Sequence, residues 1–131
     1  MSAVRYEGGC QCGQVRWRAD AEPINVRLCH CRLCQRATGG PYFARALFDD
    51  LDVTRTGKTT RWASSPRLHR LSCARCGTPV FAEPQDGPWI AVALTTLDDP
   101  LVLSPGSHIW VSAKLPWVAV EDGLPQFPKG A

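Results

Sequence analysis

The sequence has no long hydrophobic run. Its longest apolar stretch, residues 89–94, has the length of a strand, whereas a membrane-spanning helix needs roughly 20 apolar residues. Residues 1–7 also lack the apolar core of a signal peptide. We therefore predict a cytoplasmic protein with no membrane partner. Cysteines stay reduced in that compartment, so clustered cysteines favour metal or redox chemistry over structural disulfides.

The chain also lacks a block of charge of one sign. It carries 15 basic and 12 acidic residues, mixed along its length, for a net charge of +3. No nucleic-acid partner is expected from this pattern, although a mildly basic protein can attract a small anionic substrate. Internal repeats, low-complexity segments and linker-like stretches are absent too. We predict that residues 1–131 form a single domain.

Glycine and proline are instead plentiful, with 11 of each spread through the chain as turns between short apolar or alternating runs. Such spacing predicts an all-β fold, either a sandwich or a pair of curled sheets. The expected strands are residues 14–18, 42–48, 51–54, 68–72, 79–82, 89–94 and 108–111. One short helix is expected over residues 31–38, ended by Gly39 and Pro41. The residues from Pro125 onward are expected to form a loosely held tail.

The seven cysteines all belong to clusters. They follow the patterns C-x-C, C-H-C-x-x-C and C-x-x-C, at Cys10, Cys12, Cys29, Cys31, Cys34, Cys73 and Cys76. A C-x-x-C turn lets two thiolates converge on one ion at about 2.3 Å each, and zinc favours a tetrahedral set of such ligands. The spacing therefore predicts zinc binding.

Four of the cysteines predict a closed site. Cys73 and Cys76, followed by Gly77, resemble a zinc knuckle, which supplies only two ligands. Cys10 and Cys12 are the natural complement. A site with these four ligands would tie the N-terminal strand to the middle of the chain and contribute directly to folding.

The remaining three, Cys29, Cys31 and Cys34, predict an open catalytic site, so that the chain would hold two zinc ions, one structural and one catalytic. Three protein ligands leave a position for water, a carbonyl oxygen or a substrate thiolate. Zinc lowers the pKa of a group bound there. Arginines close in the sequence could offset the thiolate charge or receive substrate carboxylates. These are Arg27, Arg32 and Arg36.

Three other interpretations of the cysteines stay open. All seven could be buried reduced thiols, or a C-x-x-C pair could be redox-active, although no thioredoxin-like βαβ pattern surrounds it. The three-cysteine cluster could also take a fourth protein ligand, His30, His69 or His108, and be structural. His30 is the least favoured of these, because a residue between two adjacent ligands usually points away.

The cysteine segments resemble the glutathione-dependent formaldehyde-activating enzyme family, which includes the centromere-protein-V-like proteins. The matching segments are residues 9–13, 29–36, 73–79, 108–110, 114–117 and 122–125, and the resemblance runs from about Gly8 to Phe127. It implies curled antiparallel sheets stapled by zinc, as in the Rab-GTPase chaperone and methionine sulfoxide reductase B fold. It also implies a structural zinc on Cys10, Cys12, Cys73 and Cys76 and a second zinc on Cys29, Cys31 and Cys34. Family members known for the glutathione reaction are longer than this chain.

The resemblance implies carbon–sulfur chemistry, in which a small thiol such as glutathione joins a small aldehyde such as formaldehyde. We therefore expect a zinc-dependent carbon–sulfur lyase or synthase similar to S-(hydroxymethyl)glutathione synthase, with Cys29, Cys31 and Cys34 catalytic and His30 or water moving the proton. The alternatives are a non-catalytic zinc-binding or adduct-carrier module and a structural domain that docks a protein partner. The tryptophans are expected mainly in the core, with Trp62 the best candidate for a pocket wall.

Overall fold

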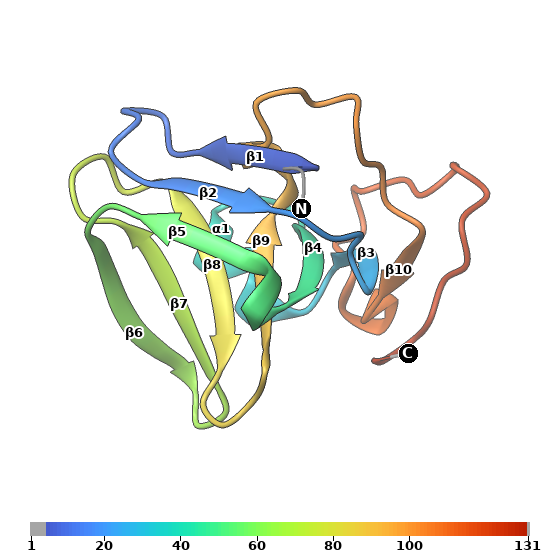
Figure 1. Cartoon of the computed structure of the whole chain (residues 1–131). Helices are drawn as coiled ribbons and strands as arrows, with labels where there is room; N and C mark the ends of the chain where they lie inside the picture. The colour runs from blue at the N-terminus through green and yellow to red at the C-terminus, as the bar shows by residue number, and fades with distance from the viewer. Residues whose placement is uncertain (1–4, 131) are drawn as a thin grey trace.

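The structure, a computed structural model, describes residues 5–130 and is built mainly of short strands (Figure 1). Residues 1–4, part of the stretch compared above with a signal peptide, lie outside the described residues. The strands are β1 (Tyr6–Gly9), β2 (Arg16–Ala19), β3 (Asn25–Cys29), β4 (Phe43–Asp49), β5 (Val53–Thr56), β6 (Thr59–Ser65), β7 (Leu68–Cys73), β8 (Pro79–Pro84), β9 (Trp89–Ala93) and β10 (Ser107–Ile109). The helices are α1 (Arg32–Thr38) and the 3₁₀ helices η1 (Asp50–Asp52), η2 (Leu94–Thr96) and η3 (Val111–Ala113).

The strands form two sheets. One has the order β1-β2-β5, and the larger has the order β10-β3-β4-β9-β8-β7-β6. The smaller sheet lies across one side of the larger one in Figure 1. The predicted β-rich fold is confirmed, but the larger sheet is mixed and not wholly antiparallel. Its edge strand β10 runs parallel to β3, because the chain crosses the molecule before it returns to that edge.

The core lies between the two sheets, where alternation in the sequence places apolar side chains. Val15 and Trp17, predicted to share a face, are both fully buried, with Phe48 and Ile90 in the same cluster. The indole N–H of Trp17 donates to Thr96 Oγ1 at 3.0 Å, which satisfies its polar atom inside the core. This burial anchors β2 against the central strands β4 and β9.

Three strands, β1, β3 and β6, were not predicted. The sequence of β6 is mainly polar and its side chains are mostly exposed, so this edge strand carries no apolar alternation. The predicted strand at 51–54 begins instead with η1. The carboxylate of Asp49 accepts from the backbone N–H of Leu51 at 2.9 Å and so caps that turn.

The predicted helix at residues 31–38 is confirmed as α1. Its N-cap is Cys31, whose Sγ accepts from the backbone N–H of Cys34 at 3.3 Å. It ends at Gly39, which has φ of 71°, a left-handed conformation that glycine adopts without a Cβ penalty. Within the described residues, no helix has the length and apolar character needed to cross a membrane.

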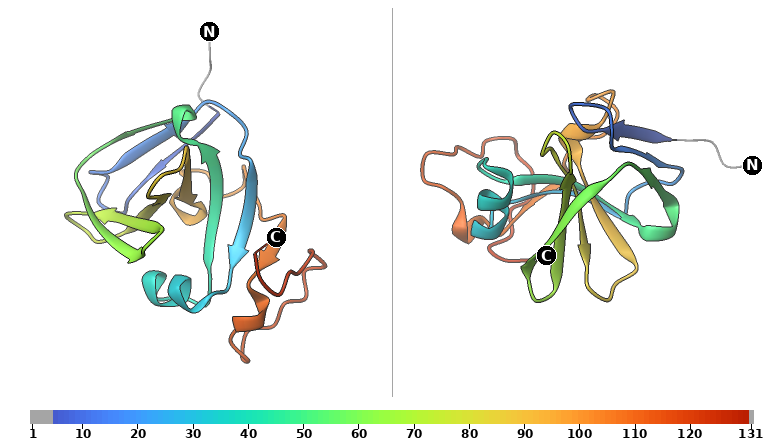
Figure 2. Two further views of the ribbon diagram at one scale, coloured as in Figure 1. Left: turned by 90° about the horizontal axis from the view of Figure 1, so that it is seen from below. Right: turned by 90° about the vertical axis from the view of Figure 1, so that its left-hand side faces the viewer.

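The prediction of a loose C-terminal tail is wrong. Gln126 forms a parallel bridge with His108, and the N–H of Phe127 donates to the His108 carbonyl at 2.9 Å. The N–H of Trp110 donates to the Lys129 carbonyl at 3.1 Å. These bonds satisfy backbone groups that β10 would otherwise expose at the sheet edge. The left view of Figure 2 shows this segment beside β10.

Candidate functional site

Four cysteines from the two sheets meet at one point. Cys10 follows β1 and Cys12 lies in the next turn, while Cys73 ends β7 and Cys76 lies in the turn before β8. Their Sγ atoms lie within 4.8 Å of one another. The Cys10–Cys12 and Cys12–Cys73 sulfur distances are 3.6 and 3.7 Å, well beyond the ~2.05 Å of a disulfide. They are close to the ~3.8 Å edge of a tetrahedron with 2.3 Å metal–sulfur bonds. This group could hold a metal ion.

Each pair of these cysteines is set by a tight turn that ends in glycine. Gly13 and Gly77 have φ of 84° and 78°, and their N–H groups donate to the carbonyls of Cys10 and Cys73. The left-handed conformation reverses the chain directly after each pair. The glycines that the sequence places after both motifs therefore shape the two turns that bring the sulfurs together.

The other three cysteines meet at the junction of β3 and α1. Cys29 ends β3, Cys31 caps α1 and Cys34 lies in its first turn, and their sulfurs also lie within 4.8 Å of one another. Hydrogen bonds from Cys29 and then Cys34 hold the pKa of the Cys31 thiol far below its ordinary value. Hydrogen bonding to Cys31 raises the pKa of Cys29. This group could also hold a metal ion, as the spacing predicted.

A cavity of about 220 Å³ opens beside this three-cysteine group. The three sulfur-bearing residues form one part of its wall, and two arginines, Arg45 and Arg70, form another. The rest of the wall is apolar: Leu33, Phe43, Leu68, Ala82, Trp89, Ala91, Ile109 and Trp110. The four-cysteine group does not line this cavity. The three-cysteine group thus differs in facing a cavity that a ligand could fill, whereas Cys12 and Cys76 of the four-cysteine group are exposed at the surface.

The arginines that line this cavity were missed by the sequence analysis. Arg70 is buried, and its Nη2 donates to Cys34 Sγ at 3.4 Å while its Nε donates to Ser64 Oγ at 2.9 Å. Its guanidinium also lies over the Phe43 ring at 5.7 Å. Burial lowers the pKa of the second arginine, Arg45. Arg45 lies on β4, 11 residues after Cys34, and Arg70 lies on β7, 36 residues after it, so that the pairing of the strands brings both to the cluster.

Two of the three arginines predicted to face the cluster lie elsewhere, and the third lies beside Arg45. Arg32 and Arg36 line a separate surface hollow with Trp117, whereas Arg27 is opposite Arg45 in the β3–β4 pair but does not itself line the cavity. On a helix, residues 32 and 36 share one face, whereas Cys34 points to another. Proximity in the sequence therefore selected two arginines that lie away from the cavity and one, Arg27, that lies next to Arg45.

The histidines do not join the cysteine groups within the described residues. His30 is fully buried, and its Nε2 lies 2.9 Å from Nδ1 of His108, whose Nε2 lies 2.7 Å from Asp122 Oδ2. Burial lowers the pKa of His30, and the hydrogen bond from His108 lowers that of Asp122. The carboxylate must accept from His108, so His108 Nδ1 accepts from His30 when both rings are neutral. This chain of bonds ties the β3–α1 junction to the C-terminal segment.

A comparison with protein families agrees with this arrangement of cysteines. The family described as glutathione-dependent formaldehyde-activating enzyme matches residues 5–113, which include both cysteine groups and the cavity wall. The chain belongs to this family. Individual relatives show how similar this chain is to other proteins in sequence and in fold.

Two curated relatives are similar in sequence to this member of the family, at modest identity. An uncharacterized lyase of Schizosaccharomyces pombe is 29% identical over 76 residues, which span 58% of this chain and 56% of that protein. The chain therefore matches little more than half of that relative's length. A putative glutathione-dependent formaldehyde-activating enzyme of Halomonas elongata is 28% identical over 128 residues, 88% of this chain and 81% of that protein.

A solved structure shares the fold of this family member. The crystal structure of a Rhodobacter sphaeroides protein superposes with a TM-score of 0.58 at 20% identity, covering 92% of this chain and 98% of the other. At that identity the likeness shows the fold alone.

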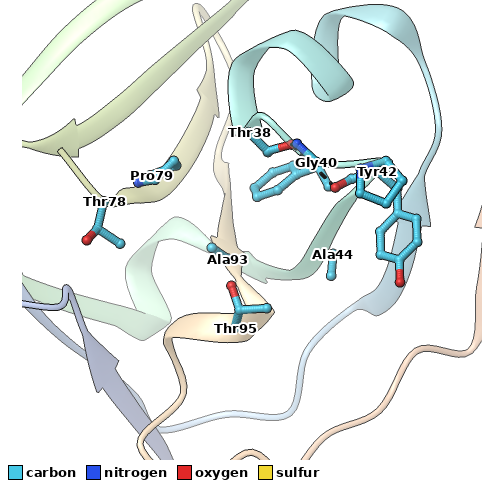
Figure 3. A pocket seen from close by; sticks show the side chains of 10 residues that line it. Thr38, Gly40, Tyr42, Ala44, Thr78, Pro79, Ala93 and Thr95 are labelled. Atoms are coloured by element: carbon cyan, nitrogen blue, oxygen red, sulfur yellow. Dashed lines mark hydrogen bonds between the residues drawn. The ribbon is translucent and has the colours of Figure 1, made fainter.

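A second hollow in this family member, of about 310 Å³, shares Phe43 with the cavity beside the three cysteines (Figure 3). Thr78 and Pro79 form one side, and Thr38 and Gly40 lie opposite them, with Ala93 between. No cysteine and no charged side chain lines it. Although it is larger than the cavity beside the three cysteines, it lacks groups that could bind a metal or activate a thiol.

The tryptophans only partly follow the prediction of core positions. Trp17 is buried, but Trp62 and Trp117 are 52% and 72% exposed. Trp62 lies on the edge strand β6 and does not line the cavity beside the three cysteines. The walls are formed instead by Trp89 and Trp110.

Proposed function

We propose that this chain is a zinc-dependent carbon–sulfur lyase or synthase that acts on a thiol–aldehyde adduct. The observation that carries the proposal is the difference between the two cysteine groups. The three-cysteine group faces a cavity of about 220 Å³, which the four-cysteine group does not line. That difference separates catalytic from structural metal sites.

The donor sets fit zinc. All the candidate ligands are cysteine sulfurs, which favour zinc over hard cations, and the sulfur distances suit tetrahedral coordination. Cys10, Cys12, Cys73 and Cys76 would hold a structural ion, and Cys29, Cys31 and Cys34 a second one. Zinc at the second site would keep a substrate sulfur ionised at neutral pH.

The chain's own residues prepare the cavity for such a substrate. Arg70 and Arg45 offset the negative charge of the thiolates, and the apolar walls reduce the water around the reacting sulfur. In the synthetic direction a bond forms between the thiol sulfur and the carbonyl carbon, and the thiol proton ends on the former carbonyl oxygen. The lyase direction breaks that bond. A cytoplasmic location and a small thiol such as glutathione with a small aldehyde as partners belong to the same proposal.

One observation favours a second candidate function, a non-catalytic carrier of the adduct. No histidine, carboxylate or hydroxyl lines the cavity in the described part of the chain, and His30 is engaged with His108 on another side. A cavity without a general acid or base would bind an adduct without accelerating its formation. An enzyme would form the adduct faster than the uncatalysed reaction, whereas a carrier would leave the rate of adduct formation unchanged.

The deciding experiment measures adduct formation from glutathione and formaldehyde by the zinc-loaded protein and by Cys31→Ser. We expect a saturable rate above the uncatalysed one for the wild type and its loss in Cys31→Ser. Zinc bound per chain is measured in parallel, with two ions expected for the wild type and one for the variant. If the rate of adduct formation is the same with and without the protein, and the protein still binds the adduct, the chain is a carrier and not an enzyme.

A further inference from the structure

The wall of the cavity beside Cys29, Cys31 and Cys34 offers no neutral hydrogen-bonding side chain other than indole N–H groups. Away from the sulfurs and the two arginines, every lining residue is apolar or aromatic. Glutathione carries carboxylates, an ammonium group and amides, each of which loses water on entering a site. Burying such groups without partners is costly. The wall is therefore poorly matched to the tripeptide.

The charges in the cavity suit a ligand that brings a single negative charge. Three thiolates exceed the charge of a divalent ion by one, and the two guanidiniums that line the cavity reverse that sign to leave one positive charge. Arg27 lies opposite Arg45 in the β3–β4 pair and outside this lining. Neither Arg45 nor Arg70 has a carboxylate within ion-pair distance among residues 5–130. Arg55, by contrast, pairs with Glu83 at 2.9 Å. A bound thiolate alone neutralises the charge of the groups that line the cavity.

The size of the cavity limits the body of the ligand. Its volume of about 220 Å³ lies below the roughly 300 Å³ at which pockets begin to enclose drug-sized ligands. A thiol with one ring or a short branched chain fits such a space. A longer ligand would have to leave much of its length in solvent.

Trp110 forms one wall in an unusual backbone conformation. Its φ of 58° and ψ of 36° place it in the left-handed region, and among the described residues it is alone in this apart from glycines. A bulky residue adopts that conformation only where the surrounding structure holds it. Its N–H donates to the Lys129 carbonyl, and its own carbonyl accepts from Ala113, so the C-terminal segment fixes this wall.

We propose that the cavity selects a thiol whose organic body is compact, apolar and uncharged, and that Trp110 determines this preference. The inference rests on the proposed function, in which the three-cysteine group binds the substrate sulfur. It names the class of thiol that this chain accepts. Glutathione then binds less tightly than an arylalkyl thiol, because its polar arms find no partners on the wall.

The test compares thiols by calorimetry under anaerobic conditions with the zinc-loaded protein. The probes are 2-phenylethanethiol, 3-mercaptopropionate, glutathione and 2-mercaptoethanol. We expect 2-phenylethanethiol to bind at least about tenfold more tightly than glutathione or 3-mercaptopropionate. Tighter binding of 3-mercaptopropionate would show that an arginine receives a substrate carboxylate and would overturn the proposal.

Trp110→Gly tests the wall without straining the backbone, since glycine favours the conformation found there. We expect this variant to lose about tenfold in affinity for 2-phenylethanethiol and to keep its affinity for 2-mercaptoethanol within about twofold. The matched control is Trp117→Ala, whose indole is exposed and does not line this cavity. Circular dichroism and zinc content confirm that both variants fold.

The outcomes separate this inference from the function on which it rests. If no thiol binds the wild type, or if every thiol binds Cys31→Ser as tightly as it binds the wild type, the proposed thiol-binding function is wrong, and this inference is wrong with it. If thiols bind but glutathione is preferred, or if Trp110→Gly leaves the ratio of affinities unchanged, only the apolar selectivity is overturned.

Discussion

Arg70 contacts both the three-cysteine group and the wall of the cavity. It donates to Cys34 Sγ and to Ser64 Oγ, and its guanidinium lies over Phe43. A cation beside a thiol favours the thiolate and therefore lowers the thiol pKa. In the metal-free protein the hydrogen bond from Cys29 lowers the pKa of Cys34, but the hydrogen bond with Cys31 and burial raise this pKa above its ordinary value overall, and the contact of Arg70 opposes that rise.

Arg70→Gln is therefore expected to reduce thiolate in the metal-free protein. Removing the cation raises the thiol pKa, so the pH profile of alkylation by iodoacetamide moves to higher pH and the rate at pH 7 falls by up to about tenfold. Mass spectrometry of peptides that contain Cys34 reads the rate. Arg67→Gln is the control, because Arg67 is exposed and does not line the cavity. An unchanged profile would mean that Arg70 acts through packing on Phe43.

Some residues of the candidate site could be predicted from the sequence, and others could not. The division of the cysteines followed from local spacing, because C-x-x-C turns and the glycines after them act within a few residues. Arg45 and Arg70 could not be found in that way. Their approach to the cluster depends on the pairing of β4 with β3 and of β7 with β8, and sheet register is set by contacts distant in the sequence.

At the scale of elements, the C-terminal segment supports the β3–α1 junction from outside. β10 pairs in parallel with β3, and the bond from His30 to His108 joins the junction to this strand. The sequence showed the apolar stretch of β10 but not its parallel pairing or the bridge from Gln126. A parallel partner arrives by a long connection, and no local pattern encodes which edge it joins.

His108→Phe tests this support. The ring is buried and links His30 to Asp122, so the substitution leaves the Nε2 of His30 without its partner. An unsatisfied buried group costs about 1–3 kcal/mol, and we expect a loss of that size in the free energy of unfolding measured with urea. Amide hydrogen exchange near Cys29 should quicken as well.

His69→Phe serves as the control for this substitution. His69 is half-buried on β7, and its Nδ1 already lacks a hydrogen-bond partner among the described residues. We expect less than half of the loss seen for His108→Phe. Equal losses would show that ring packing, and not the chain of hydrogen bonds, supports the junction.

At the scale of the whole molecule, the four-cysteine group joins the two sheets. Cys10 and Cys12 belong to the turn between β1 and β2 in the small sheet, whereas Cys73 and Cys76 flank the turn between β7 and β8 in the large one. An ion held there would crosslink segments more than 60 residues apart and would stabilise the folded state by its binding free energy. The three-cysteine group spans only six residues within one junction, so an ion there would crosslink little.

The two proposed metal sites should therefore contribute unequally to stability. We expect Cys12→Ser and Cys34→Ser each to lower zinc content by one ion per chain. Cys12→Ser should lower Tm strongly, because it opens the link between the sheets, while Cys34→Ser should lower Tm by a few degrees and abolish thiol binding. Differential scanning calorimetry with metal analysis measures both effects. A larger loss of Tm in Cys34→Ser would reverse the roles of the two sites, since it would make the junction of β3 and α1, and not the contact between the sheets, the point at which metal holds the fold.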